Sequence, residues 1–213
     1  MILLIGAPAL CLLICLPLYM YYKQSPRFHL ALLFKSTGTL CAMIPALVAA
    51  IRLDPCCYIC AAGLLVCAAA DYLLELSMYL GAGFFIAGHI CYIAFFLRLF
   101  PISALHFICL IACFGIIAYV LYQNRQAIGK RMPFFAIYGV VLSVMTACAI
   151  GSMASFTLQG ILLAAGGALF FVSDSILLHR TLYPAGNAVS WVIMITYYAA
   201  QLLIGLSCLY IGK

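Results

Sequence analysis

The sequence is poor in charged residues, and acidic residues are the rarest of them. Asp, Glu, Lys and Arg together make up 7% of the 213 residues, and only four residues are acidic. A soluble domain carries about 25% charged residues. Here 69% of the residues are hydrophobic and the mean hydropathy is +1.27. This composition excludes an ordinary soluble domain and indicates a polytopic membrane protein.

Long polar segments are also absent, so the chain has no room for a domain outside the membrane. A helix needs about 20 apolar residues to span a bilayer, and short connections marked by Pro, Gly or charge separate runs of this length. We predict an all-α fold of about eight transmembrane helices in one compact bundle, forming a single domain over residues 1–213. The predicted helices are 2–21, 28–51, 56–78, 81–99, 102–122, 133–153, 157–179 and 188–211.

The first run lacks a basic segment before it and a small-residue cleavage site, so we expect a retained helix rather than a signal peptide. The formal charge is +6, but the basic residues are spread over helix ends, which favours a role in membrane topology over nucleic-acid binding. The connections between the predicted helices are numbered in chain order, so that the first, third, fifth and seventh lie on one side of the membrane. These odd-numbered connections hold Lys23, Arg27, Arg125, Lys130, Arg131 and Arg180, and the opposite side holds Arg52, Arg98 and Lys213. We therefore expect cytosolic odd connections and two non-cytosolic termini.

The twelve cysteines do not indicate a disulfide framework. Most fall inside the apolar runs, where a free thiol packs as a small hydrophobe. Cys57 and Cys60 have CxxC spacing, but no second pair accompanies them. His89 is the only histidine deep in a run, which argues against an intramembrane zinc site. Metalloprotease, serine-hydrolase, P-loop and dinucleotide motifs are missing. We expect no metal and no cofactor.

Three of the four acids, Asp71, Glu75 and Asp174, lie inside the apolar runs. A carboxylate in the hydrocarbon region costs roughly 2.5 to 3.5 kcal/mol on insertion scales, so it normally has a partner, a water-filled cavity or a task. The depth of each polar residue is counted from the membrane face at the odd-numbered connections, at a rise of about 1.5 Å per residue. On this count the polar residues lie within one layer about 12 Å deep. This layer contains Lys35, Asp71, Glu75, His89, Tyr138 and Asp174. We predict that Asp71 and Asp174 face one polar cavity that Lys35 lines.

The supporting residues each allow two interpretations. Glu75 is one turn from Asp71 and either forms an acid/base pair with it or reaches interfacial water. Lys35 neutralises an Asp or binds a phosphate, or else its long stem carries its charge to the interface. His89 and Tyr92, one turn apart, support the site or pack in the core.

The same sequence offset separates Asp71 from Asp174 and Lys35 from Tyr138. Two parallel halves of four helices would produce this pattern, and so would chance.

Several short segments, in this order and spacing, are similar to motifs of one family. They are Asp71–Leu74, Phe84–Tyr92, Tyr138 with Met145, Gly167–Asp174 and Tyr197–Gln201. Together they resemble the lysoplasmalogenase, YhhN-like family of small integral membrane proteins. Lys35 stands where this resemblance leads us to expect a lysine, although Ser36 follows it where a proline is typical.

The resemblance implies an eight-helix enzyme with Asp71 and Asp174 as catalytic residues. Its substrate would be a lysophospholipid of the bilayer, a lysoplasmalogen, whose vinyl ether bond is hydrolysed to a fatty aldehyde and glycerophospho-ethanolamine or -choline. One carboxyl group would protonate the β carbon, and an ionised partner would stabilise the oxocarbenium ion and activate water. The assignment of these two roles stays open. Tyr138, His89 and Ser173 would orient water or the headgroup.

The main alternative is a small proton-coupled or cation transporter, in which the buried acids bind protons or substrate during alternating access. The repeated offset favours it, whereas the position of the polar layer in one third of the membrane disfavours it. A scaffold is a weaker third option. For localisation, we expect a multi-pass protein of a bacterial plasma membrane rather than of the endoplasmic reticulum. Headgroup preference and oligomeric state stay open.

Overall fold

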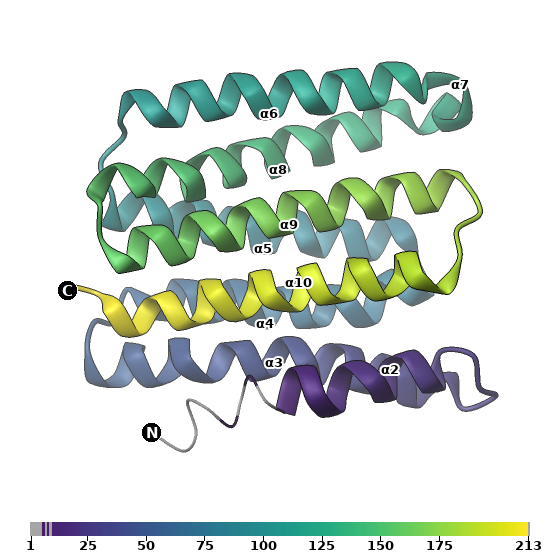
Figure 1. Cartoon of the computed structure of the whole chain (residues 1–213), viewed down its shortest axis with the longest axis horizontal. Helices are drawn as coiled ribbons and strands as arrows, with labels where there is room; N and C mark the ends of the chain where they lie inside the picture. The colour runs from purple at the N-terminus through teal and green to yellow at the C-terminus, as the bar shows by residue number, and fades with distance from the viewer. Residues whose placement is uncertain (1–5, 7, 9, 213) are drawn as a thin grey trace.

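The computed structural model describes residues 6, 8 and 10–212 and consists of long helices that run along one common axis (Figure 1). The long helices are α3 (Phe28–Arg52), α4 (Cys57–Leu76), α5 (Met78–Leu99), α6 (Ala104–Gln123), α8 (Met132–Gly151), α9 (Leu158–Leu182) and α10 (Asn187–Ser207). The short helices are η1 (Cys11–Cys15), α2 (Leu16–Tyr22), α7 (Arg125–Ile128), η2 (Gly129–Arg131), η3 (Ser152–Ser155) and η4 (Cys208–Tyr210).

Within the described residues, seven helices are long and apolar enough to cross a membrane. The predicted all-α polytopic fold is therefore confirmed. The first predicted helix, 2–21, lies partly outside the described residues, and its described part is the shorter apolar helix Cys11–Tyr22. Helix α9 extends past the predicted end at 179 to Leu182, so Arg180 belongs to its last turn.

Six of the helices close into a ring. Each packs on the next in the order α3, α4, α5, α8, α9 and α10, and α10 packs back on α3. Helix α6 lies outside this ring against α8, and α2 lies outside it against α3 (Figure 1). Because consecutive helices run in opposite directions, the connections after α2, α4, α6 and α9 share one end of the bundle, on the right in Figure 1. These are the odd-numbered connections; which side of the membrane they face stays a prediction.

Small residues set the close approach of the helices that carry polar groups. A side chain at Gly205 in α10 would overlap the carbonyl oxygen of Ala42 in α3, and one at Gly167 in α9 would overlap the methyl group of Ala149 in α8. Small residues at helix interfaces allow backbones to approach closely in a membrane. Helix α3 is continuous through Ser36, so no break accompanies the missing proline.

The thiols take no part in cross-links. All twelve cysteines are free, and most of them are buried among the hydrophobic residues of the bundle.

Candidate active site

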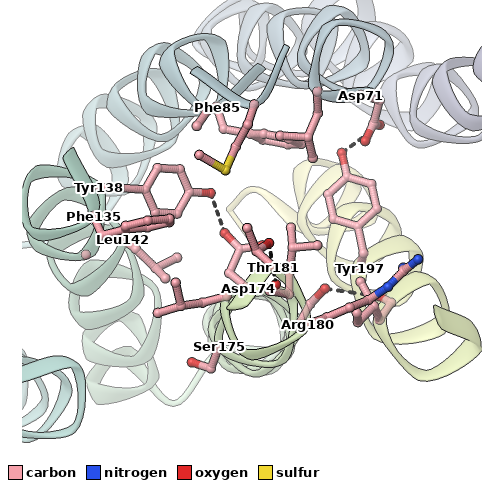
Figure 2. Close-up of a pocket in the computed structure, with 18 of the residues that line it drawn as sticks. Asp71, Phe85, Phe135, Tyr138, Leu142, Asp174, Ser175, Arg180, Thr181 and Tyr197 are labelled. Carbon is pink, nitrogen blue, oxygen red and sulfur yellow. Dashed lines mark hydrogen bonds between the residues drawn. The ribbon is translucent and has the colours of Figure 1, made fainter. Parts of the chain in front are cut away.

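A cavity of about 330 Å³ lies at the end of the bundle that holds the odd-numbered connections, and it is lined by the six ring helices together with α2 and α6. Six of the predicted site residues line it, namely Lys35, Asp71, Glu75, Tyr138, Ser173 and Asp174. Two others, His89 and Tyr92, are fully buried and do not line the cavity. Figure 2 shows Asp71 and Asp174 on different helices, with Tyr197 reaching the first and Tyr138 the second.

Asp71 lies on α4 and is 1% exposed. Its Oδ2 accepts hydrogen bonds from the hydroxyl of Thr39 at 2.5 Å and from that of Tyr197 at 2.8 Å. The Nζ of Lys35 is 4.0 Å from the other oxygen, Oδ1. Two hydroxyl donors and one ammonium group therefore surround a single buried carboxyl group, and all of them stabilise its charged form.

A chain of buried amide and phenol groups fixes the Tyr197 hydroxyl. Gln201, one turn further along α10, donates from Nε2 to that hydroxyl at 3.0 Å. Its Oε1 accepts a hydrogen bond from the Tyr92 hydroxyl at 2.6 Å. Tyr92 therefore supports Asp71 through Gln201 and Tyr197 rather than by contact with the cavity.

Asp174 lies on α9 and has different neighbours. Its Oδ2 accepts a hydrogen bond from the Tyr138 hydroxyl at 2.5 Å, and the Nε2 of His89 is 3.9 Å from the same oxygen. Both ring nitrogens of His89 are buried without a hydrogen-bond partner among the described residues. The Phe170 ring packs edge-on against the imidazole at 4.8 Å between centroids. Asp174 thus has one hydroxyl donor and a nearby imidazole, whereas Asp71 has two hydroxyl donors and a nearby ammonium group.

Glu75 belongs to a cluster of charges nearer the end of the bundle. Its Oε1 accepts from the Nζ of Lys35 at 2.9 Å and from the hydroxyl of Tyr19 at 2.9 Å, and the Nζ of Lys23 is 3.9 Å away. The two interpretations of Glu75, an acid/base pair with Asp71 and contact with interfacial water, stay predictions. Glu75 is the ion-pair partner of Lys35.

Ser173 lines the cavity, but its hydroxyl donates to the carbonyl oxygen of Ile193 at 3.0 Å. It thereby joins α9 to α10. Aromatic rings pack at the cavity: the centroid of the Tyr197 ring lies 5.9 Å from that of Phe85, which also lines the cavity, and 5.5 Å from that of the fully buried Phe170. The site therefore combines two carboxyl groups with a largely apolar wall.

Sequence reasoning missed five residues that contact the predicted ones. Thr39 and Tyr197 donate to Asp71, and Tyr19 donates to Glu75. Gln201 donates to Tyr197, and Lys23 donates to Tyr19. Spacing would have indicated two of them, because Thr39 follows Lys35 and Gln201 follows Tyr197 by one helical turn. Lys23 was considered only for topology. Among the described residues, no group of three or more His, Cys, Asp or Glu side chains is arranged to hold a metal ion.

The fold and the cavity define a small polytopic membrane protein with a two-carboxylate site inside its helical ring. The family model of the YhhN family matches residues 30–208. The chain belongs to this family, which confirms the resemblance. The matched range includes both aspartates and Arg180, and it begins after Tyr19 and Lys23. No curated protein and no solved structure matches the chain.

Proposed function

We propose that the protein is a lysoplasmalogenase, which hydrolyses the vinyl ether bond of lysoplasmalogens to a fatty aldehyde and glycerophospho-ethanolamine or -choline. Membership of the YhhN family fits this activity. The observation that carries the proposal is the pair Asp71 and Asp174 on one cavity, each with a different set of partners. Two carboxyl groups in unlike surroundings are suited to separate acid and charge-stabilising roles.

Hydrolysis of a vinyl ether begins with proton transfer to its β carbon. This step turns the carbon–carbon double bond into a single bond and leaves an oxocarbenium ion. Water then adds to the cationic carbon and loses a proton to a base, which gives a hemiacetal. The hemiacetal breaks into the aldehyde and the glycerol hydroxyl. The chemistry needs one acid, one group that stabilises positive charge and one base.

We assign the charge-stabilising role to Asp71. The hydroxyls of Thr39 and Tyr197 and the ammonium of Lys35 favour its carboxylate form, which attracts an adjacent oxocarbenium ion. We assign the proton donor to Asp174. Only Tyr138 donates a hydrogen bond to it, and its Oδ1 accepts none from the described residues. A carboxyl proton on Oδ1 can therefore face a substrate in the cavity.

The lining of the cavity suits an amphiphile. Charged groups come from the segment after α2 and from α3, α4 and α9, whereas α5, α6 and α8 contribute a mostly apolar side. The apolar side includes Ala82, Phe85, Ile117, Leu121, Phe135 and Leu142. A volume of about 330 Å³ is at the small end of ligand pockets, which measure about 300 to 1,000 Å³. The cavity thus accommodates the glycerol and vinyl ether, with the remaining alkyl chain beyond it.

Aldehyde release from a lysoplasmalogen by the purified protein tests the proposal. The saturated ether analogue has no double bond to protonate and serves as the control. Absence of release across headgroups and chain lengths would contradict the proposal and favour the transporter.

A further inference from the structure

Two cations mark the end of the cavity that lies nearest the odd-numbered connections. Lys23 directly follows α2, and Arg180 lies in the last turn of α9; both line the cavity. Neither belongs to the groups that contact the aspartates. Lys23 donates a hydrogen bond from Nζ to the Tyr19 hydroxyl at 2.8 Å and lies 3.9 Å from Glu75.

Of the three basic residues that line the cavity, Lys23 and Lys35 have carboxylate partners, and Arg180 has none among the described residues. Among the described residues no hydrogen bond or ion pair engages its guanidinium group, although the residue is half-buried. A buried or half-buried charge is costly unless a partner compensates it. The guanidinium group is planar and always charged, and its donors match a phosphate in a bidentate arrangement. The missing partner is therefore best supplied by an oxyanion.

Lys23 has one negative neighbour, Glu75 at 3.9 Å, which it shares with Lys35. Tyr19 accepts its hydrogen bond and Glu75 attracts its ammonium group, whereas the charges of Lys35 and Arg180 repel it. Burial, together with repulsion from Arg180 and Lys35, lowers the pKa of Lys23 from 10.5 to about 8. Glu75 is itself engaged by Lys35 at 2.9 Å. An anion placed between Lys23 and Arg180 would relieve this repulsion.

The spacing along α9 fits a glycerophospholipid. Arg180 lies less than two turns beyond Asp174, which corresponds to about 9 Å along the helix axis. Five covalent bonds separate the vinyl ether oxygen from the phosphorus of a lysoplasmalogen, a span of about 6 Å at ordinary bond lengths. With the vinyl ether at Asp174, the phosphate therefore lies within reach of the Arg180 side chain.

We propose that Lys23 and Arg180 form a phosphate-binding subsite that holds the phosphodiester of the lysolipid headgroup at the mouth of the cavity. The proposal rests on the proposed function and adds a specificity to it: lysophospholipids are preferred over alkenylglycerols, which lack the phosphate. Free phosphate offers the same chemistry to the two cations, so the test distinguishes the two sources.

The test compares two substrates, 1-alkenyl-glycero-3-phosphoethanolamine and 1-alkenylglycerol, for the wild type and the variants Lys23→Gln and Arg180→Gln. A charge-assisted hydrogen bond is worth about a tenfold change in affinity or more. We expect each variant to raise KM for the phosphorylated substrate about tenfold or more and to leave KM for the alkenylglycerol unchanged. Arg180→Lys keeps the positive charge and should raise KM for the phosphorylated substrate less than Arg180→Gln does.

Arg131→Gln is the matched control. Arg131 lies at the same end of the bundle, donates to the carbonyl oxygens of Ile128 and Ala127, and does not line the cavity. We expect it to behave as the wild type with both substrates. Equal losses on both substrates in Arg180→Gln, or no loss on the phosphorylated one, would contradict the subsite.

Inhibition of alkenylglycerol hydrolysis separates a headgroup from a free anion. We expect hexadecyl-glycero-phosphoethanolamine, a saturated ether, to inhibit at least tenfold more strongly than inorganic phosphate. Equally strong inhibition by inorganic phosphate, lost in Arg180→Gln, would overturn the headgroup assignment.

If the wild type hydrolyses neither substrate, the proposed function fails, and binding then decides on the subsite by itself. The saturated ether lysophospholipid should raise the thermal stability of the wild type more than hexadecylglycerol does, and Arg180→Gln should abolish this difference. Equal shifts with both ligands in the wild type would refute the subsite.

Discussion

Replacement of Lys35 by methionine tests the charge cluster most severely. Lys35 is the one cation close to two carboxyl groups: its Nζ lies 2.9 Å from Glu75 and 4.0 Å from Asp71. Its side chain is 6% exposed, and that of Asp71 is 1% exposed. Methionine keeps much of the volume but removes the charge. The buried Asp71 carboxylate then has no ammonium partner, and Glu75 keeps only Lys23.

The expected cost follows from these contacts. Removal of one partner from a buried ion pair costs about 3 to 5 kcal/mol. Glu75 is 19% exposed and keeps Lys23 at 3.9 Å, so we expect the low end, about 3 kcal/mol. For a chain of this size, 1 kcal/mol corresponds to about 2 to 4 °C in Tm, so Lys35→Met should lower Tm by about 6 to 12 °C.

Thermal unfolding of the purified variants in one detergent measures this effect. The double variant Lys35→Met/Glu75→Gln should recover part of the loss, because it removes the carboxylate that Lys35 contacts most closely. Lys130→Met, at an exposed position at the same end of the bundle, is the control and should change Tm by little. A wild-type Tm for Lys35→Met, or no recovery in the double variant, would refute the reasoning.

Three further predictions address single features of the site. Tyr138→Phe removes the one hydroxyl donor to Asp174 and should lower kcat about tenfold without loss of folded protein, as measured by aldehyde release and gel filtration. As the pH rises through about 8, Lys23 loses its charge, so KM should rise for the phosphorylated substrate and stay constant for alkenylglycerol. Gly205→Val forces α10 away from α3 and should abolish folding, seen as loss of monodisperse protein.

The helices and the depth of the polar layer were predictable because each depends on the chain alone. Long apolar runs define the spans, and a constant rise per residue converts sequence position into depth. Lys35, Asp71 and Asp174 accordingly line one cavity. Sequence position converts into depth in this way because helices that span a membrane are aligned along one axis.

The rotation of each helix about its axis was not predictable in the same way. Apolar residues surround these helices on all sides, so no polar face reports which side chains point inward. Tyr92 consequently lies behind the wall, and Ser173 turns its hydroxyl to a backbone carbonyl. The hydroxyl donors to Asp71 became visible only when α3, α4 and α10 were placed together.

The most direct test of the account is the rate of aldehyde release by the folded variants Asp71→Asn and Asp174→Asn, relative to the wild type. Asparagine keeps the volume of aspartate but neither delivers a carboxylic proton nor carries a negative charge. General acid/base catalysis alone contributes about 10²- to 10⁴-fold, and loss of charge stabilisation adds to it. We predict a loss of at least about 10²-fold for each variant at unchanged folded yield. A rate within about tenfold of the wild type for either folded variant would contradict the catalytic role of that aspartate.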